Sequence, residues 1–261
     1  MSRRGAGSLV LGLAILLQGC AGLFTAKERL PEPAPTATAP GVKGGFQVLK
    51  GRPGFVIGAP HGSSDSATDV IGRDLARLTG FSLVVATGFS HLDGDGRRFN
   101  VNRPTESVPG SPARLEGETE AARNVYLAYR RSVDEASQGP LRFYVEVHGN
   151  GRKESAGRVE IATVGLSKDD AWRLKTLLEL IRDARLGDQD ETPRLDVWLE
   201  AHDPIWYTAS AAKQSGVLAT SERALHIEMP KAARTTYREA YTQVIADFIS
   251  QSAALLVPGE R

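Results

Sequence analysis

Two apolar runs of strand length, residues 54–59 and 81–86, enclose a segment with the spacing of a helix. In this segment, residues 68–78, the apolar side chains recur at helical intervals, and Gly80 follows as a stop signal. The run 81–86 is apolar almost throughout, which is typical of a strand covered on both faces. Strand, helix and strand within about 35 residues form a βαβ unit. The pattern therefore predicts an α/β fold.

The same patterns extend along the rest of the chain. Short apolar or alternating runs predict strands, and longer periodic segments predict helices. Further strands are expected at 46–49, 142–148, 159–164, 195–199 and 224–229, and further helices at 116–136, 168–184 and 237–256. Residues 88–112 carry no such period. Long segments of this kind within a compact domain are commonly functional.

The N-terminal region does not read as part of this domain. A short basic start precedes an apolar run, residues 9–17, that is too short to span a bilayer as a mature helix. Leu17-Gln-Gly-Cys20 follows and resembles the lipobox of bacterial lipoproteins. It predicts a signal peptide at 1–19, with cleavage before Cys20 and lipidation of its thiol. The alternatives are an ordinary signal peptide that ends near Ala21 and an uncleaved anchor.

The region after Cys20 is rich in Pro, Ala and Thr and cannot form a core. We expect residues 20–44 to be a tether and residues 45–261 to be one α/β domain. No Asp follows the cysteine, and by the usual sorting pattern this favours the outer membrane. The predicted location is the cell envelope, with the domain in the periplasm and lipid as the single membrane contact.

Composition excludes several classes of function. The chain has 32 basic and 31 acidic residues, and its net charge of +1 provides no field that would recruit nucleic acid. A single cysteine rules out an internal disulfide and a cysteine-based zinc site. The Gly-x-Ser-x-Gly turn of serine hydrolases is absent from the sequence.

Candidate metal ligands follow the predicted strands. His61 follows the strand 54–59 after Pro60, and Asp65 and Asp69 come shortly after His61, at the start of the predicted helix. His148 ends the strand 142–148. In open α/β sheets, ligands bind at the carboxyl ends of strands. Two histidines and a carboxylate can hold zinc and leave one position open for water. The last strand ends in Glu228, a carboxylate placed to act as general base.

Each of these residues also has a structural interpretation. Asp65 or Asp69 can be a helix N-cap, and His148 can be satisfied by the backbone. Glu228 can form a salt bridge with Lys231 or Arg234. His226 shares a strand face with Glu228 and can hydrogen-bond within the site.

Five short motifs occur in the order found in N-formylglutamate amidohydrolases. They are Pro60-His61-Gly62, Thr68-Asp69, Asn102-Arg103-Pro104, Val147-His148-Gly149 and Ile227-Glu228. The same order resembles, more distantly, zinc carboxypeptidases and poly-γ-glutamate hydrolases. The resemblance covers roughly residues 50–232. It implies a three-layer α/β fold, in which a mixed, mostly parallel sheet has helices on both faces and zinc at its strand ends.

By this resemblance, His61, His148 and Asp65 or Asp69 bind zinc and Glu228 is the general base. Asn102 and Arg103 then hold a carboxylate of the substrate. The implied function is a zinc-dependent amidohydrolase acting on a small molecule or peptide, such as an N-acyl glutamate.

Two positions depart from the family patterns. Ser64 stands where the carboxypeptidases have Glu, and Asn100 stands where the formylglutamate enzymes usually have Asp. These departures leave open the alternative of a non-catalytic lipoprotein that binds a ligand in a retained pocket.

Overall fold

The computed structural model describes residues 44–62, 64–89, 98–107 and 115–257. Seven strands form one sheet in the order β1-β3-β2-β6-β9-β7-β8. Their bounds are β1 Gly45–Leu49, β2 Arg52–Ala59, β3 Phe81–Thr87, β6 Phe143–Asn150, β7 Arg158–Val164, β8 Asp196–Leu199 and β9 Arg223–Pro230. All seven cover strands that the sequence predicts.

The central part of the sheet is parallel. Strands β3, β2, β6 and β9 are hydrogen-bonded neighbours that run in one direction. At one edge β1 is antiparallel to β3, and toward the other edge β7 is antiparallel to β9 while β8 runs parallel to β7. The sheet is therefore mixed and mostly parallel, which confirms the predicted fold class. The first parallel pair, β2 and β3, is the predicted βαβ unit.

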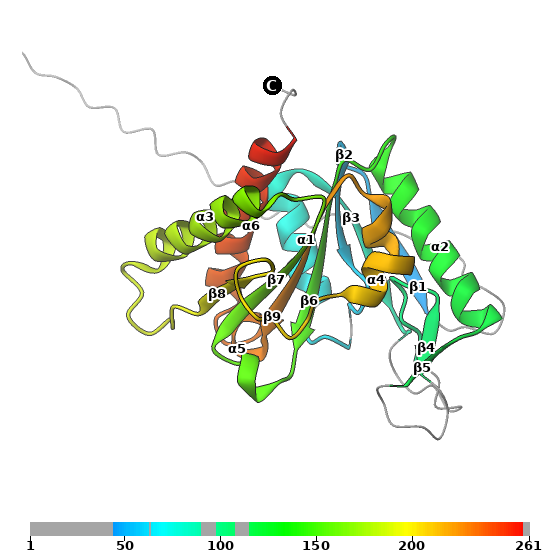
Figure 1. Cartoon of the computed structure of the whole chain (residues 1–261), viewed down its shortest axis with the longest axis horizontal. Coiled ribbons are helices and arrows are strands. Elements are labelled where there is room, and N and C mark those ends of the chain that lie inside the picture. Colours follow the sequence, from blue (N-terminus) through cyan, green and yellow to red (C-terminus); the bar gives the residue numbers. More distant parts are fainter. Residues whose placement is uncertain (1–43, 63, 90–97, 108–114, 258–261) are drawn as a thin grey trace, which may run out of the picture. The chain divides into compact units, whose positions relative to one another are not determined.

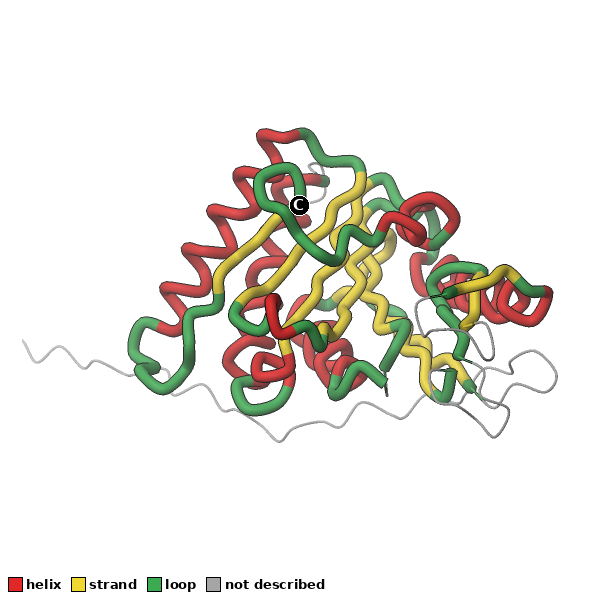
Figure 2. The backbone as a smooth tube through the Cα atoms, turned by 60° about the horizontal axis from the view of Figure 1, so that its bottom comes forward, coloured by secondary structure: helices red, strands yellow, loops and turns green. Residues whose placement is uncertain are grey.

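Helices cover both faces of this sheet (Figures 1 and 2). On one face, α1 (Thr68–Thr79), α3 (Lys168–Leu186) and α6 (Arg238–Leu256) pack on side chains such as Ile57 and Val145. On the other face, α2 (Glu120–Ser137) and the region around α4 (Ser210–Ser215) pack on residues such as Val56 and Tyr144. Successive strand residues thus enter two separate cores, as expected for side chains that alternate across a pleated sheet.

The end of α1 shows how local sequence positions the strands. Ile71 and Leu75 are buried on the side of α1 that faces the sheet. Gly80 ends the helix with a φ of 73°, a left-handed conformation that glycine adopts without steric cost, and its N–H donates to the Ala76 carbonyl. The chain reverses here and enters β3 at Phe81.

The helix predicted from residue 116 begins later. Residues Glu116–Glu118 form β5, which pairs with β4 (Thr105–Ser107) in a separate two-stranded sheet. Thr119 is the N-cap of α2, since its hydroxyl accepts a hydrogen bond from the Ala122 N–H at 3.1 Å. Within α2, the apolar residue Leu127 is 41% exposed. Periodicity alone does not separate a helix start from a preceding short strand.

The remaining described elements are short. They are η1 (Lys153–Ser155), η2 (Val217–Thr220) and α5 (Lys231–Arg234). The predicted signal peptide, Cys20, nearly all of the predicted tether and His91 lie outside the described residues. Within the described part, none of the helices combines the length and apolar character needed to cross a membrane.

Candidate metal centre

Three neighbouring strands bring the candidate residues together. β2 ends beside β6, and β6 pairs in parallel with β9 along its whole length. In that register Glu146 lies opposite His226, and His148 lies opposite Glu228. Residues two apart on a strand point to the same face, so these four side chains share the face of the sheet that α2 covers. His61 joins them from the turn after β2.

A cavity of about 360 Å³ lies at these strand ends. Five of the predicted site residues line it: His61, Asp65, Arg103, His148 and Glu228. The other lining residues are Arg98, Asn100, Glu116, Gly149, His226 and the segment 206–212. The fold therefore places the predicted ligands and the predicted base around one space that admits solvent.

The three predicted metal ligands, His61, Asp65 and His148, lie close to one another. Asp65 Oδ2 lies 3.6 Å from His148 Nδ1 and accepts the Gly149 N–H at 3.1 Å. The rings of His61 and His148 meet edge to face, with centroids 5.1 Å apart. Asp69 instead pairs with Arg73 at 3.1 Å and does not line the cavity. Of the two aspartates left open by the sequence, the structure brings Asp65 to the histidines.

The turn that carries these residues is tightly packed. The Asp65 N–H donates to the His61 carbonyl, and the Gly62 N–H donates to the Ala86 carbonyl on β3. A Cβ atom at position 62 would lie 2.8 Å from that Ala86 oxygen. Gly62 is therefore needed for the close approach of this turn to β3. This contact holds the turn from which His61 lines the cavity.

The three groups differ in protonation state, because each has different neighbours. Burial lowers the pKa of His61 to about 3, so that its imidazole is neutral and able to ligate. For Asp65, burial acts in the opposite direction, but His148 and the other neighbours outweigh it and lower the pKa to about 2. Burial also opposes the shift of His148, whose two carboxylate neighbours, Asp65 and Glu146, raise its pKa to about 10. Without metal, His148 therefore carries a proton that a metal ion has to displace.

His61 also has a buried ring nitrogen without a hydrogen-bond partner among the described residues. His61 is 6% exposed, and its Nδ1 atom forms no hydrogen bond within the described part of the chain. An unsatisfied buried polar atom costs roughly 1–3 kcal/mol. A neutral imidazole with an unpaired nitrogen, beside an ionised carboxylate and a second histidine, fits a bound cation.

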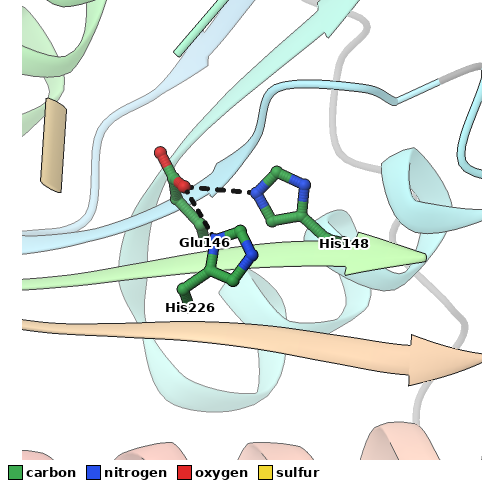
Figure 3. Close-up of side chains that lie close together, drawn as sticks. All are labelled: Glu146, His148 and His226. Atoms are coloured by element: carbon green, nitrogen blue, oxygen red, sulfur yellow. Dashed lines mark hydrogen bonds and ion pairs between the residues drawn. The ribbon is translucent and has the colours of Figure 1, made fainter. Parts of the chain in front are cut away.

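A second group of possible ligands shares His148. The ligand atoms of Glu146, His148 and His226 all lie within 4.8 Å of one another (Figure 3). Glu146 Oε2 lies 3.2 Å from both His148 Nε2 and His226 Nδ1, and it accepts a hydrogen bond from Asn102 Nδ2 at 3.0 Å. These three residues could also hold a metal ion. Glu146, however, is fully buried and does not line the cavity.

Glu228 has two oxygens in different environments. Oε1 lies 3.1 Å from His226 Nε2, whereas Oε2 has no hydrogen-bond partner among the described residues. The salt bridge with Arg234 considered from the sequence is not formed. Arg234 instead donates to the backbone carbonyls of Ser66, Met229 and Asn150 and so joins three segments beneath the site. Glu228 thus lines the cavity, and its Oε2 atom is buried there without a hydrogen-bond partner in the described part of the chain.

The predicted carboxylate-binding pair is already engaged. Arg103 Nε donates to Glu116 Oε2 at 2.9 Å in a two-pronged contact, and its Nη1 donates to Asn102 Oδ1 at 3.3 Å. Asn102 is fully buried and does not line the cavity, because its amide joins Arg103 to Glu146. The structure therefore brings Arg103 to the cavity and places Asn102 behind it.

Several residues of the site lie outside the sequence prediction. Glu146 was detectable, because it shares a strand face with His148 two residues later. Trp206 and Tyr207 had no sequence signal. Their backbone N–H groups are held by the buried carboxylate of Glu160, at 2.8 and 3.1 Å. His202 contacts the Lys168 carbonyl on the surface and does not line the cavity.

No protein-family model matches the chain, and no curated protein matches it. Solved structures do resemble it. A bacteriophage poly-gamma-glutamate hydrolase is 14% identical with a TM-score of 0.46, and the match covers 82% of this chain and 90% of that one. A metallo-carboxypeptidase from Burkholderia cenocepacia is 14% identical with a TM-score of 0.47, and the match covers 86% of this chain and 67% of that one. Similarity of this degree is confined to the outline of the fold. Membership of the N-formylglutamate amidohydrolase family stays a prediction.

Proposed function

We propose that this chain is a zinc-dependent amidohydrolase with its metal bound by His61, Asp65 and His148 and with Glu228 as general base. One observation carries the proposal. Two histidines, an ionised carboxylate and a carboxylate with an unpaired oxygen all line the same cavity of about 360 Å³. This is the set of groups that hydrolytic zinc sites use.

Access to the cavity favours this ligand set over Glu146, His148 and His226. A catalytic metal keeps an open position for water or substrate. His61, Asp65 and His148 line the cavity, whereas Glu146 lies behind them. The carboxylate of Glu146 already faces donors from Tyr144, Asn102 and two histidines. Its role in the proposal is to hold His148 Nε2, so that Nδ1, which faces Asp65, is the atom that would bind the metal.

The remaining chemistry belongs to Glu228. A metal ion bound at the site would act as a Lewis acid toward the substrate carbonyl and lower the pKa of a water molecule. Glu228 Oε2 takes a proton from the attacking water as the new C–O bond forms. It then delivers this proton to the amide nitrogen as the C–N bond breaks, so that the products are a carboxylic acid and an amine.

The substrate in this proposal carries a free carboxylate. Arg98 and Arg103 both line the cavity, and a guanidinium can bind a carboxylate through two parallel hydrogen bonds. A substrate carboxylate would have to share or replace the contact between Arg103 and Glu116. N-acyl glutamates and cell-wall peptide fragments both meet this requirement, in keeping with an enzyme of the cell envelope.

Metal content and turnover test the proposal together. The full chain, purified in detergent, is analysed for metal by mass spectrometry and assayed against N-formyl and N-acetyl glutamate and against peptides with a free carboxylate. About one zinc per chain with hydrolysis supports the amidohydrolase. Bound zinc without any turnover would favour the non-catalytic binding protein, and no metal after incubation with zinc would overturn the mechanism.

The cellular location is a separate proposal. We infer from the lipobox that Cys20 is lipidated and that the lipid anchors the domain to the outer membrane, facing the periplasm. Mass spectrometry of the N-terminal peptide, beside the Cys20→Ser variant, tests this. We expect an acylated Cys20 in the parent and a soluble or uncleaved chain in the variant, whereas an unmodified Cys20 would contradict it.

A further inference from the structure

His226 lies between two carboxylates. Its Nδ1 atom is 3.2 Å from Glu146 Oε2, and its Nε2 atom is 3.1 Å from Glu228 Oε1. The side chain is 6% exposed, and its ring lies against that of His148 with centroids 4.2 Å apart. The imidazole therefore has little freedom to turn, and both of its nitrogens are directed at carboxylate oxygens.

Glu146, on the Nδ1 side of the imidazole, is held in place by residues other than His226. Glu146 accepts hydrogen bonds from Tyr144 OH at 3.2 Å and from Asn102 Nδ2 at 3.0 Å. Tyr144 OH in turn lies 3.0 Å from Tyr129 OH, which belongs to α2. All four of these residues are fully buried. Glu146 is thus an anchored group against which His226 can be held.

Glu228 lacks such support from any other side chain in the described part of the structure. His226 Nε2 is the partner of Oε1, and Oε2 has none. Rotation about the last side-chain bond of a glutamate is soft, so without His226 the two oxygens of Glu228 could exchange places or turn away from the cavity.

We propose that His226 is a positioning residue that transmits the fixed orientation of Glu146 to Glu228, so that Oε2 is the oxygen that accepts and delivers the proton. This inference rests on the proposed function of Glu228. It assigns His226 a role different from metal binding, although His226 belongs to the group that could hold a metal ion. A carboxylate held in one orientation meets the attacking water without a reorganisation step.

Two substitutions of different chemistry test the proposal in the full chain. His226→Leu removes both ring nitrogens, whereas His226→Gln keeps an amide N–H group that can reach Glu228. We expect His226→Leu to retain one metal per chain and a nearly unchanged KM while kcat falls about 10- to 100-fold, the range seen for supporting residues around metal sites. His226→Gln should recover a large part of kcat. Equal losses of kcat in both variants, or loss of metal from His226→Leu, would overturn the positioning role.

A second readout separates this inference from the proposed function. With carboxyl-¹³C-labelled glutamate in the full chain, the signal of Glu228 is identified by its absence in Glu228→Gln. We expect this signal to shift in His226→Leu and to return toward the parent value in His226→Gln. An unshifted signal in His226→Leu would refute the contact. If the parent binds metal but hydrolyses no amide, the proposed function fails, and the carboxyl signal still decides whether His226 positions Glu228.

Discussion

His148 and Glu228 are register partners on the adjacent parallel strands β6 and β9. Two residue pairs earlier in the same ladder, Glu146 lies opposite His226 with its Oε2 atom 3.2 Å from the His226 Nδ1 atom. The backbone pairing thus fixes a metal-ligand candidate beside a base candidate, and the side chains of Glu146 and His226, on the same face of the sheet, contact His148 and Glu228. Because hydrogen bonds of the sheet hold this spacing, it does not depend on the conformation of a surface loop.

The ligand assignment predicts which substitutions remove the metal. We expect Asp65→Asn, His61→Ala and His148→Ala each to lose bound zinc, because each removes one of the groups that line the cavity. Glu146→Gln is the matched control, since it should keep zinc with weakened affinity of about 10- to 100-fold. Mass spectrometry after dialysis measures the zinc content of each variant. If zinc were retained in Asp65→Asn but absent from Glu146→Gln, the metal ligands would instead be Glu146, His148 and His226.

Glu228 is predicted to act in turnover and not in metal binding. Glu228→Gln keeps the shape of the side chain but removes its basicity. We expect one zinc per chain and a loss of kcat of about 10²- to 10⁴-fold, the usual contribution of a general base. Initial rates and metal content of the same preparation check this. An active Glu228→Gln variant would exclude Glu228 as the base.

The pKa of His148 predicts the pH dependence of the metal-free protein. Its pKa rises from 6.5 in the unfolded chain to about 10 in the fold. The folded state therefore binds the proton more tightly, so the stabilisation is complete below about pH 6.5 and is lost as the pH rises toward 10. Urea unfolding between pH 7 and 10 should show a fall in stability that His148→Gln lacks. If the unfolding free energy of the two proteins changed with pH in parallel, the raised pKa of His148 would be contradicted.

Proton competition at His148 also predicts how zinc binding depends on pH. Zinc has to displace the proton that Asp65 and Glu146 hold on this imidazole. The apparent zinc affinity should therefore increase as the pH rises from 6 to 8, with release of at least one proton per metal bound. Calorimetric titrations in buffers of different ionisation enthalpy measure the proton count, and a count near zero would contradict displacement of a proton from His148.

The contact between Arg103 and Glu116 predicts a change in substrate affinity. Glu116→Gln removes the negative charge that Arg103 now faces at the cavity. We expect a lower KM for substrates with a free carboxylate, whereas Arg103→Met should raise KM. Substrates in which that carboxylate is amidated should be nearly insensitive to both changes. Equal effects on the two kinds of substrate would mean that Arg103 supports its loop without binding the carboxylate.

Arg234 is predicted to hold the site together from below. Its guanidinium donates to the carbonyls of Ser66, Met229 and Asn150, and it is 5% exposed. Arg234→Met should cost about 2–4 kcal/mol of unfolding free energy, since it leaves buried carbonyls without donors. The exposed neighbour Lys231→Met is the control and should change stability little. Urea unfolding of both variants checks the difference.

The order of strands and helices was determined by the sequence itself. Apolar runs such as 54–59 and 81–86 and the periodic segment between them predict elements that the structure confirms. The positions of His61, His148 and Glu228 at strand ends follow from the same runs. Parallel neighbours end at one edge of a sheet, so residues that close separate strands meet there. Local patterns are sufficient for this part, because burial of apolar side chains determines both the elements and their ends.

The tertiary structure alone decided which polar side chains meet. Asp65 and Asp69 are equivalent in sequence, but the close packing of Gly62 on Ala86 turns Asp65 toward His148 and leaves Asp69 with Arg73. Asn102 was predicted to contact substrate, and the fold uses its amide to join Arg103 to Glu146. Glu116 was predicted to begin a helix, but it lies in the short strand β5, and its carboxylate accepts a hydrogen bond from Arg103. These outcomes depend on hydrogen bonds between residues far apart in the chain, for which local periodicity carries no signal.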